Sequence, residues 1–252
     1  MQSRSGLFGP WARARHGLAF MAFMMALPGI AQAQSFVDTF EAPTFDAFWS
    51  LVQQNGSASL STDTSQSGFQ SAKLTGTGGG QVNVWLAHAF PQRTPGTLSV
   101  WFYDSGPGLY AGLYASDSQT GDGFSVNVTD WNPSTYVWYG GQMSATATSV
   151  PRTVGWHKIE LEVSGTGFAA RLDGTVVGSL PGSFGFDDVR LLVSGPGQVG
   201  TFYFDDFRFI APLSVPASKD DCKDGGWQHL VRSDGSSFRN QGACVSYVNT
   251  GH

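Results

Sequence analysis

The feature that most constrains this chain is a series of short segments in which hydrophobic and polar residues alternate. In His157–Val163 (HKIELEV) every second residue is hydrophobic, which is typical of a β-strand with one solvent-exposed face. Phe168–Leu172 and Thr175–Val177 flank Asp173-Gly174, a dipeptide typical of a two-residue hairpin turn. Segments of this kind, divided by turn residues, recur from Phe36 to Phe209 and predict antiparallel β-structure.

Further segments rich in β-branched and aromatic residues are Leu98–Asp104, Val189–Val193 and Thr201–Phe209. Charged residues make up only 13% of the chain and Gly accounts for 33 of 252 residues, a composition that excludes helical bundles and coiled coils. About a dozen short strands without a convincing helix predict an all-β, two-layer antiparallel sandwich.

One break in the alternation lies near the end of this region. Phe202 and Phe204 share a phase, whereas Phe207 and Phe209 follow in the opposite phase after Asp205-Asp206. A β-bulge at the two aspartates would bring all four rings to one face and redirect one carboxylate. The alternative is a strand that aromatic residues bury on both faces.

Residues 1–33 have the three parts of a secretory signal peptide. Arg4, Arg13 and Arg15 precede an apolar run at residues 17–27 (GLAFMAFMMAL), and Ala31-Gln32-Ala33 fits the small-x-small cleavage pattern. The run is too short to span a bilayer, although an N-terminal membrane anchor is the alternative. No later apolar stretch approaches 18 residues. We therefore expect no membrane span in the mature chain, which should be secreted to the extracellular space, the periplasm or the cell surface.

Removing residues 1–33 changes the charge balance. The whole chain has a formal net charge of −5, and this segment holds three arginines and no acidic residue, so the mature chain carries −8. The mature sequence contains no cluster of Lys and Arg, and such an acidic chain is a poor nucleic-acid binder. The sequence does not indicate an oligomeric state.

The two cysteines, Cys222 and Cys244, both lie near the C-terminus. In an oxidising compartment such a pair predicts one disulfide; a metal site with His229 and His252 is the alternative, but the spacing matches no zinc pattern. We expect a sandwich domain at 34–210, a Pro-containing linker at 211–218 and a small Cys-containing module at 219–252 that depends on its disulfide.

Several segments of the sandwich resemble a known superfamily. Asp38–Glu41 (DTFE), Leu98–Asp104 (LSVWFYD), Phe186–Leu191 (FDDVRL) and Tyr203–Phe207 (YFDDF) are similar to secreted bacterial domains of the concanavalin A-like lectin/glucanase (laminin-G-like) superfamily. The resemblance implies a jelly-roll β-sandwich whose first and last strands are neighbours and in which a concave sheet often holds carbohydrate. Its motifs are mostly structural, so they imply the fold more than an activity.

The C-terminal segment resembles a separate short module at the ends of secreted bacterial proteins. The matching segments are Cys222–Gln228 (CKDGGWQ) and Phe238–Tyr247 (FRNQGACVSY). This resemblance supports the pairing of Cys222 with Cys244 and implies no biochemical role.

Four carboxylates lie on the two terminal strands that the jelly-roll topology would bring together: Asp38, Glu41, Asp205 and Asp206. Hard carboxylate oxygens that converge with backbone carbonyls suit Ca²⁺, so a structural calcium ion that ties the chain ends together is one prediction. The alternative is that these side chains cap turns or are solvated.

Sugar binding requires aromatic faces and hydrogen-bonding side chains, and both are concentrated between Tyr103 and Tyr139. The residues that we favour as ligand contacts are Tyr103, Asp104, Asn127, Asp130, Trp131, Asn132, Tyr136 and Trp138, and the wider set adds Tyr110, Tyr114 and Tyr139. The alternative for each aromatic residue is core packing. We expect the core to contain Trp49, Trp85, Trp101 and Trp156.

Catalytic motifs are not evident. Glycoside hydrolysis needs two carboxylates about 5 to 10 Å apart, and the laminarinase-like strand motif Glu-x-Asp-x-x-Glu is approached only by Glu160-Leu-Glu162, whose pattern is that of an ordinary solvent face. A Tyr/His base of a lyase, with His88 or His157, has no motif to support it. No catalytic residue is therefore assigned.

Three functions remain open. The leading hypothesis is a secreted, non-catalytic carbohydrate-binding or surface-associated protein whose partner is an extracellular polysaccharide. The second is a structural or adhesive extracellular protein without sugar specificity, and the third is a polysaccharide hydrolase or lyase.

Overall fold

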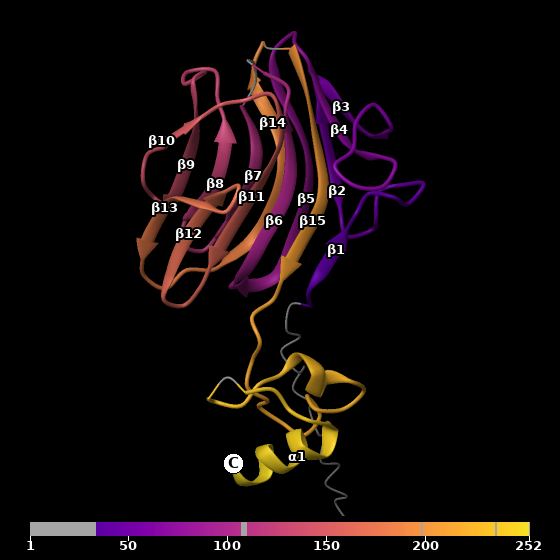
Figure 1. Ribbon diagram of the computed structural model, residues 1–252, viewed down its shortest axis with the longest axis vertical. Coiled ribbons are helices and arrows are strands. Elements are labelled where there is room, and N and C mark those ends of the chain that lie inside the picture. Colours follow the sequence, from indigo (N-terminus) through magenta and orange to yellow (C-terminus); the bar gives the residue numbers. More distant parts are fainter. Residues whose placement is uncertain (1–33, 107–109, 198, 235, 252) are drawn as a thin grey trace, which may run out of the picture. The chain divides into compact units, whose positions relative to one another are not determined.

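A computed structural model describes residues 34–106, 110–197, 199–234 and 236–251. The predicted signal peptide, residues 1–33, lies outside these ranges. Within them the chain forms fifteen strands, one short 3-10 helix and one α-helix, and Figure 1 shows the strands arranged as two facing sheets. The predicted two-layer antiparallel β-sandwich is confirmed.

One sheet has eight strands. Seven follow the order β13-β12-β11-β6-β15-β4-β3, and β1 pairs with β15. Their bounds are β1 Phe36–Asp38, β3 Gly56–Ser61, β4 Ser71–Thr77, β6 Gly96–Asp104, β11 Gly155–Val163, β12 Gly167–Leu172, β13 Thr175–Pro181 and β15 Val199–Ile210. The pairing of β1 with β15 (Figure 1) joins the first and last strands of the sandwich, as the jelly-roll resemblance implied.

The other sheet has seven strands in the order β10-β9-β8-β7-β14-β5-β2. Their bounds are β2 Ser50–Gln54, β5 Gln81–Thr94, β7 Tyr110–Ser116, β8 Gly123–Val128, β9 Thr135–Gly141, β10 Thr146–Pro151 and β14 Phe186–Pro196. All pairings in both sheets are antiparallel.

The core lies between the inner faces of the two sheets. It is built from alternate strand residues, such as Leu98, Val100 and Phe102 of β6, which are fully buried. The hairpin turn Asp173-Gly174 joins β12 to β13 with both residues at positive φ, 50° and 77°. This is the backbone that the Asp-Gly pair predicted.

The predicted bulge in the last strand is confirmed. The register between β15 and β6 shifts between Asp205 and Arg208, and Asp206 has a φ of 49°. Phe202 and Phe204 before the bulge and Phe207 and Phe209 after it are all fully buried in the core. Asp205 is also buried, and its Oδ2 accepts hydrogen bonds from the backbone amides of Gln66 and Ser67 at 2.8 and 3.1 Å.

The expectation that four tryptophans are core residues is wrong for three of them. Trp49 is buried in the core. Trp85, Trp101 and Trp156 are only partly buried and alternate with inward-facing residues, so they lie on the outer faces of the sheets. Their size suggested burial, whereas the phase of each strand decides the face.

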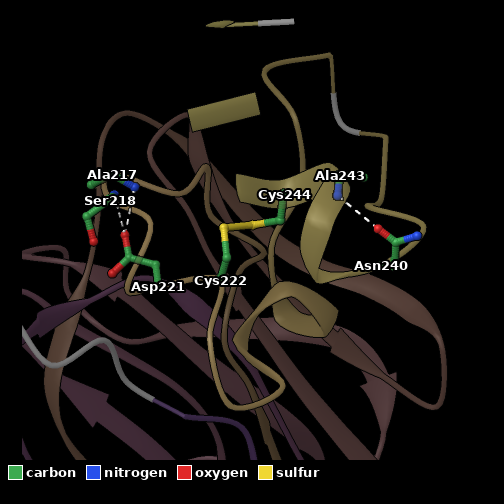
Figure 2. The surroundings of a disulfide bond; sticks show 7 residues. All are labelled: Ala217, Ser218, Asp221, Cys222, Asn240, Ala243 and Cys244. Carbon is green, nitrogen blue, oxygen red and sulfur yellow. Dashed lines mark hydrogen bonds between the residues drawn. A yellow bond between two sulfur atoms is a disulfide. The ribbon is translucent and has the colours of Figure 1, made fainter. Parts of the chain in front are cut away.

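The C-terminal module contains a small separate core of Cys222, Leu230, Phe238, Cys244 and Tyr247. The predicted disulfide Cys222–Cys244 is present (Figure 2). The 3-10 helix η1 (Gly226–His229) and the helix α1 (Gln241–Thr250) lie within it. Helix α1 begins at the N-cap Asn240, whose side chain accepts from the amide of Ala243 (Figure 2), and ends at Gly251 in the left-handed region.

Residues just before the module are bound to it at two places. Ser214 forms a parallel bridge with Leu230, and Asp221 accepts hydrogen bonds from the amides of Ala217 and Ser218 (Figure 2). The second half of the expected 211–218 linker is therefore hydrogen-bonded to the module. No helix in the described residues is long and apolar enough to cross a membrane.

Candidate functional site

The outer face of the seven-stranded sheet carries a concentration of aromatic and polar side chains. Inward-facing residues such as Val84, Leu113 and Val126 belong to the core, so the residues between them point outward. We call this outer surface the tyrosine face and define it by Trp85, Tyr110, Tyr114, Asn127, Tyr139 and Arg190. These residues come from β5, β7, β8, β9 and β14.

Strand register aligns these side chains in rows across the sheet. In the first row, Tyr139 of β9 pairs with Ser125, Ser125 with Tyr114, Tyr114 with Arg190, and Arg190 with Ala87. Ser125 separates the two tyrosines and Ala87 follows Arg190, whereas Tyr114 and Arg190 are direct neighbours.

The second row runs parallel to the first. Val137 pairs with Asn127, Asn127 with Gly112, Gly112 with Leu192, and Leu192 with Trp85. Asn127 and Val137 are at most 1% exposed, although neither faces the core. The β8 and β9 part of this row is therefore buried, whereas Trp85 at its other end is partly exposed.

The third row is polar. Tyr110 pairs with Ser194, and Ser194 pairs with Asn83. The Ser194 hydroxyl donates to Asn83 Oδ1 at 3.1 Å, and Asn83 Nδ2 donates to Gln54 Oε1 at 2.7 Å. Neutral hydroxyl and amide groups thus extend the face toward β2.

Arg190 lies between two aromatic rings. Its guanidinium carbon is 5.2 Å from the centroid of Trp85 and 5.9 Å from that of Tyr114, and such contacts hold a cation over a ring face. Its Nε is 2.7 Å from Asp188 Oδ2, an ion pair whose angles are not those of a hydrogen bond. Burial raises the pKa of the Asp188 carboxyl, and the Arg190 charge opposes that shift. The two charges balance one another.

Asn127 has an unpaired acceptor. Its Nδ2 donates to the Ser125 hydroxyl at 2.5 Å, but its buried Oδ1 accepts no hydrogen bond from the described residues. A buried acceptor without a partner costs about 1–3 kcal/mol. An asparagine at this position therefore does not stabilise the sandwich, and its presence needs another explanation.

The hydroxyls of Tyr110 and Tyr139 stay protonated near neutral pH. Burial raises the pKa of Tyr110 to about 12, with a hydrogen bond from Ser125 acting in the opposite direction. Burial also raises the pKa of Tyr139, with Tyr114 and Asp122 adding to the effect. These groups therefore act as neutral donors and acceptors of hydrogen bonds.

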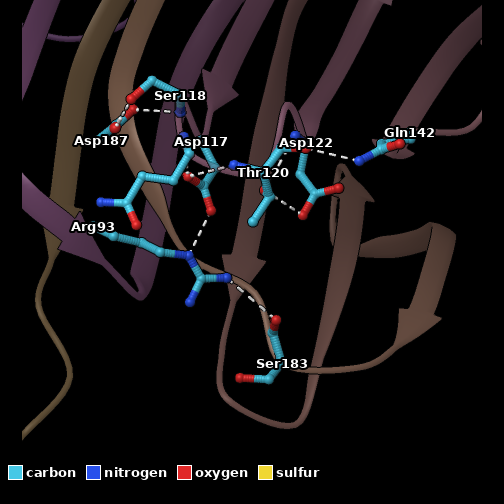
Figure 3. Close-up of polar contacts among 9 residues, drawn as sticks. Arg93, Asp117, Ser118, Thr120, Asp122, Gln142, Ser183 and Asp187 are labelled. Atoms are coloured by element: carbon cyan, nitrogen blue, oxygen red, sulfur yellow. Dashed lines mark hydrogen bonds and ion pairs between the residues drawn. The ribbon is translucent and has the colours of Figure 1, made fainter.

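Polar contacts hold the turn between β7 and β8, next to the tyrosine face (Figure 3). Asp117, which is fully buried, pairs with Arg93 Nε at 2.5 Å and accepts from the amides of Gln119 and Thr120 at 2.9 and 3.3 Å. Ser118 donates its amide to Asp187 at 3.0 Å. This network holds the strand ends from which Tyr114 and Gly123 project.

The eight favoured ligand contacts lie in separate places. Asn127 belongs to the tyrosine face. Trp131, Asn132 and Asp130 lie in the β8–β9 connection, where Trp131 is 59% exposed and Asn132 Nδ2 donates to Thr135 at 2.7 Å. That connection follows the strand that carries Asn127, so it borders the third row.

The other favoured residues are not on this face. Asp104 is buried in an ion pair with Arg152, and Tyr136 is fully buried beside them. Trp138 points inward and packs against Phe168, while Tyr103 lies on the outer face of the other sheet. As ligand contacts, all of these stay predictions. The residues that sequence reasoning missed are Trp85 and Arg190.

Three of the four predicted calcium ligands, Asp38, Glu41 and Asp205, accept hydrogen bonds from N–H groups. Asp38 accepts from the Phe40 amide and the Trp49 indole, and Glu41 accepts from the amides of residues 69 and 70. Within the described ranges, no three His, Cys, Asp or Glu side chains form a cluster suited to a metal ion. These contacts are those of turn-capping carboxylates, and calcium binding stays a prediction.

The acidic residues Glu160 and Glu162 behave as a solvent face. Lys158 Nζ lies 3.1 Å from Glu160, and Arg171 Nη1 lies 3.0 Å from Glu162. Both glutamates lie on the eight-stranded sheet, whereas the tyrosine face lies on the seven-stranded sheet. Each glutamate has a basic partner.

Comparison of this geometry with solved structures identifies the fold. The cellulose-induced protein Cip1 superimposes with a TM-score of 0.55 at 15% identity, over 69% of this chain and 96% of Cip1. The fold is a jelly roll of this kind. The apo Crh5 transglycosylase gives a TM-score of 0.50 at 15% identity, over 71% of this chain and 85% of Crh5.

A third structure shares the jelly roll, a GlcNAcα1-4Gal-releasing endo-β-galactosidase from Clostridium perfringens. Its TM-score is 0.51 at 13% identity, over 73% of this chain and 64% of the enzyme. At these identities the likeness concerns the fold alone. The sequence matches no protein-family model and no curated protein.

Proposed function

We propose that this chain is a secreted carbohydrate-binding protein that holds a polysaccharide on its tyrosine face without cleaving it. The observation that carries the proposal is the gathering of Trp85, Tyr114 and Tyr139 on an outer sheet face where core packing does not require them. Aromatic rings offer apolar faces to the C–H surface of sugars, while hydroxyl and amide groups beside them bind sugar hydroxyls.

The charges of the face favour a ligand that is largely uncharged. Arg190 is balanced by Asp188 at 2.7 Å, and the phenols of Tyr110 and Tyr139 stay neutral because their pKa values are raised. The remaining polar groups of the third row are hydroxyls and amides. A glycan rich in hydroxyl groups matches these donors and acceptors.

A binding role fits this face better than hydrolysis. Among the outward residues of the three rows and of the adjacent row, in which Asp188 pairs with Ser116 and Ala89, Asp188 alone has a carboxylate. Glycoside hydrolysis uses two carboxylates about 5 to 10 Å apart. A tyrosine with a raised pKa is also a poor general base. Glu160 and Glu162 are paired with basic residues on the other sheet.

The fold and the disulfide support the setting of this function. Cip1 is named for its induction by cellulose, Crh5 is a transglycosylase and the clostridial enzyme releases a disaccharide, so the jelly roll occurs in proteins connected with carbohydrates. The disulfide Cys222–Cys244 is typical of chains that fold in an oxidising compartment. Both agree with an extracellular protein.

The test is retention of the chain from Gln34 to His252 on a panel of neutral and acidic polysaccharides, with sugar release measured in parallel. We expect retention on one glycan class, no released sugar, and markedly weaker retention in Trp85→Ala and Tyr114→Ala. Trp131→Ala tests whether the β8–β9 connection extends the face. Phe69→Ala is the matched control, because Phe69 is 84% exposed and outside the tyrosine face.

Each other outcome points to one of the alternatives. A folded protein that is retained on no polysaccharide would favour a structural or adhesive role. Release of sugar or of unsaturated products would favour a hydrolase or a lyase. Retention that neither tyrosine-face substitution weakens would place the binding surface elsewhere.

A further inference from the structure

The outer face of the eight-stranded sheet carries a second group of aromatic side chains. Trp156 of β11 pairs in register with Tyr103 of β6, Tyr103 with Tyr203 of β15, and Tyr203 with Lys73 of β4. We call Trp156, Tyr103 and Tyr203 the aromatic row. Because it crosses neighbouring strands in one register, the three rings lie side by side on one surface.

Ring contacts run through the whole row. The centroids of Trp156 and Tyr103 are 5.3 Å apart with planes at 72°, and those of Tyr103 and Tyr203 are 5.9 Å apart with planes at 86°. Lys73 Nζ lies 5.9 Å from the Tyr203 centroid. Each ring is partly exposed. The edge-to-face contacts between neighbouring rings hold the row in place.

Core packing does not explain the aromatic row. The residues that alternate with it, Phe102, Phe202 and Phe204, fill the core from the inner face and are fully buried. Farther along β11, the same outer face carries Lys158, Glu160 and Glu162. The sheet therefore changes from an ordinary charged surface to an aromatic one within a single strand.

A loop held by several hydrogen bonds borders the row. Asp63 accepts from Lys73 Nζ at 2.6 Å and from the Tyr203 hydroxyl at 3.2 Å. The same loop, residues 62–70, is held by the buried carboxylate of Asp205, which binds the amides of Gln66 and Ser67. The hydrogen-bonding groups beside the rings are therefore ordered before any ligand arrives, which lowers the entropic cost of binding.

We propose that the aromatic row is a second carbohydrate-binding surface, whose ligand is a neutral, extended polysaccharide chain that crosses the strands. Trp156 and Tyr203 are separated by two strand spacings, roughly 10 Å, which is close to the repeat of every second sugar in an extended β-1,4-linked chain. Lys73 and Asp63 neutralise one another, so the surface carries no unbalanced charge for an acidic glycan.

The two surfaces lie on opposite sheets of one sandwich. The tyrosine face belongs to the seven-stranded sheet and the aromatic row to the eight-stranded sheet, and their side chains point in opposite directions. A polysaccharide strand that lies flat on one face cannot contact the other face. One protein molecule would therefore join two polysaccharide strands, and binding at two sites raises the overall avidity.

The experiment measures binding and cross-linking separately, with barley β-glucan, galactomannan and xyloglucan as soluble probes. Affinity electrophoresis measures retention, and turbidity measures cross-linking. The double variant Trp156→Ala, Tyr203→Ala should be retained about tenfold less strongly in a background that already carries Tyr114→Ala, and alone it should abolish turbidity. Glu162→Gln is the matched control on the same strand and face.

Distinct results overturn the two proposals. Turbidity that persists in the double variant would overturn the second surface and leave the tyrosine face intact. Loss of turbidity in Tyr114→Ala without any effect of the double variant would do the same. If the double variant fails to fold, aromatic-ring NMR of the unsubstituted chain decides: unchanged Trp156 and Tyr103 resonances at saturating β-glucan would overturn the proposal, and shifted ones would support it.

Discussion

Arg152 and Asp104 form a buried, two-point ion pair near one end of the sandwich. Arg152 Nε lies 2.9 Å from Asp104 Oδ2, and Arg152 Nη2 lies 2.7 Å from Oδ1. Their side chains are 6% and 1% exposed. The pair connects the residue that follows β10, in the seven-stranded sheet, to the end of β6, in the eight-stranded sheet, so it joins the two sheets at one end of the sandwich.

Removal of one partner of this pair should strongly destabilise the sandwich. Arg152→Met leaves the Asp104 carboxylate buried without its counter-charge, and such changes cost about 3–5 kcal/mol. Urea unfolding should show this loss. The control is Arg171→Met, which breaks the exposed pair with Glu162 and should cost less than about 1 kcal/mol. Equal losses in both variants would contradict a special contribution of the buried pair.

Gly123 makes room for two rings of the tyrosine face. A Cβ at this position would lie 2.5 Å from Tyr139 Cε1 and 3.0 Å from the Tyr114 hydroxyl. Gly123→Ala should displace both rings and weaken polysaccharide retention about tenfold, or about 1.4 kcal/mol. Because the rings lie on the outer face and can rotate, the free energy of unfolding should change little.

A second glycine provides the opposite control. At Gly178 a Cβ would lie 2.1 Å from Trp138 Cδ2, and Trp138 packs against the core. Gly178→Ala should therefore destabilise the chain by about 1–3 kcal/mol without changing retention per folded molecule. Equal retention by Gly123→Ala and the unsubstituted chain would show that the positions of Tyr114 and Tyr139 do not matter for binding.

The sequence predicted the strands well because their signals are local. Alternation in His157–Val163, the Asp173-Gly174 turn and the phase break at Asp205-Asp206 each depend on a few neighbouring residues, and all three features are present. The helix α1 was missed, although Asn240 and Gly251 are typical N-cap and C-terminal residues of a helix.

The candidate site was less predictable, for two physical reasons. Trp85 was assigned to the core by its size, although its place between Val84 and Leu86 indicates the opposite face. The rows across the sheet also depend on strand order: Tyr114 of β7 adjoins Arg190 of β14, a pairing of residues far apart in the chain. Local patterns do not encode such neighbours.

The Asp117 carboxyl should make stability depend on acidic pH. Burial acts to raise its pKa, but hydrogen bonds from Arg93 and from the amides of Gln119 and Thr120 outweigh burial, so the pKa is lowered. A carboxyl with a lowered folded-state pKa contributes stability that is fully present above about pH 4 and is lost as the pH falls through the folded-state value.

Arg93→Gln tests this dependence by removing the main hydrogen bond that lowers the pKa. The free energy of unfolding should fall less steeply below about pH 4 in this variant than in the unsubstituted chain. Asp205 is a useful contrast, because burial raises its pKa and its contribution to stability should decline as pH rises. Parallel pH profiles for the variant and the unsubstituted chain would contradict the role assigned to Arg93.

The C-terminal module should depend on its disulfide far more than the sandwich does. Cys222 and Cys244 are 22 residues apart, and closing such a loop stabilises a fold by about 3 kcal/mol in the chain-entropy account. The module has only a small core, in which the rings of Phe238 and Tyr247 lie 5.4 Å apart. The double variant Cys222→Ser, Cys244→Ser should therefore expose these rings to chymotrypsin while the sandwich stays resistant. Both cysteines of the chain lie in the module, so these substitutions change no residue of the sandwich. Cleavage that spreads at once into the strands would therefore show that the two parts unfold together.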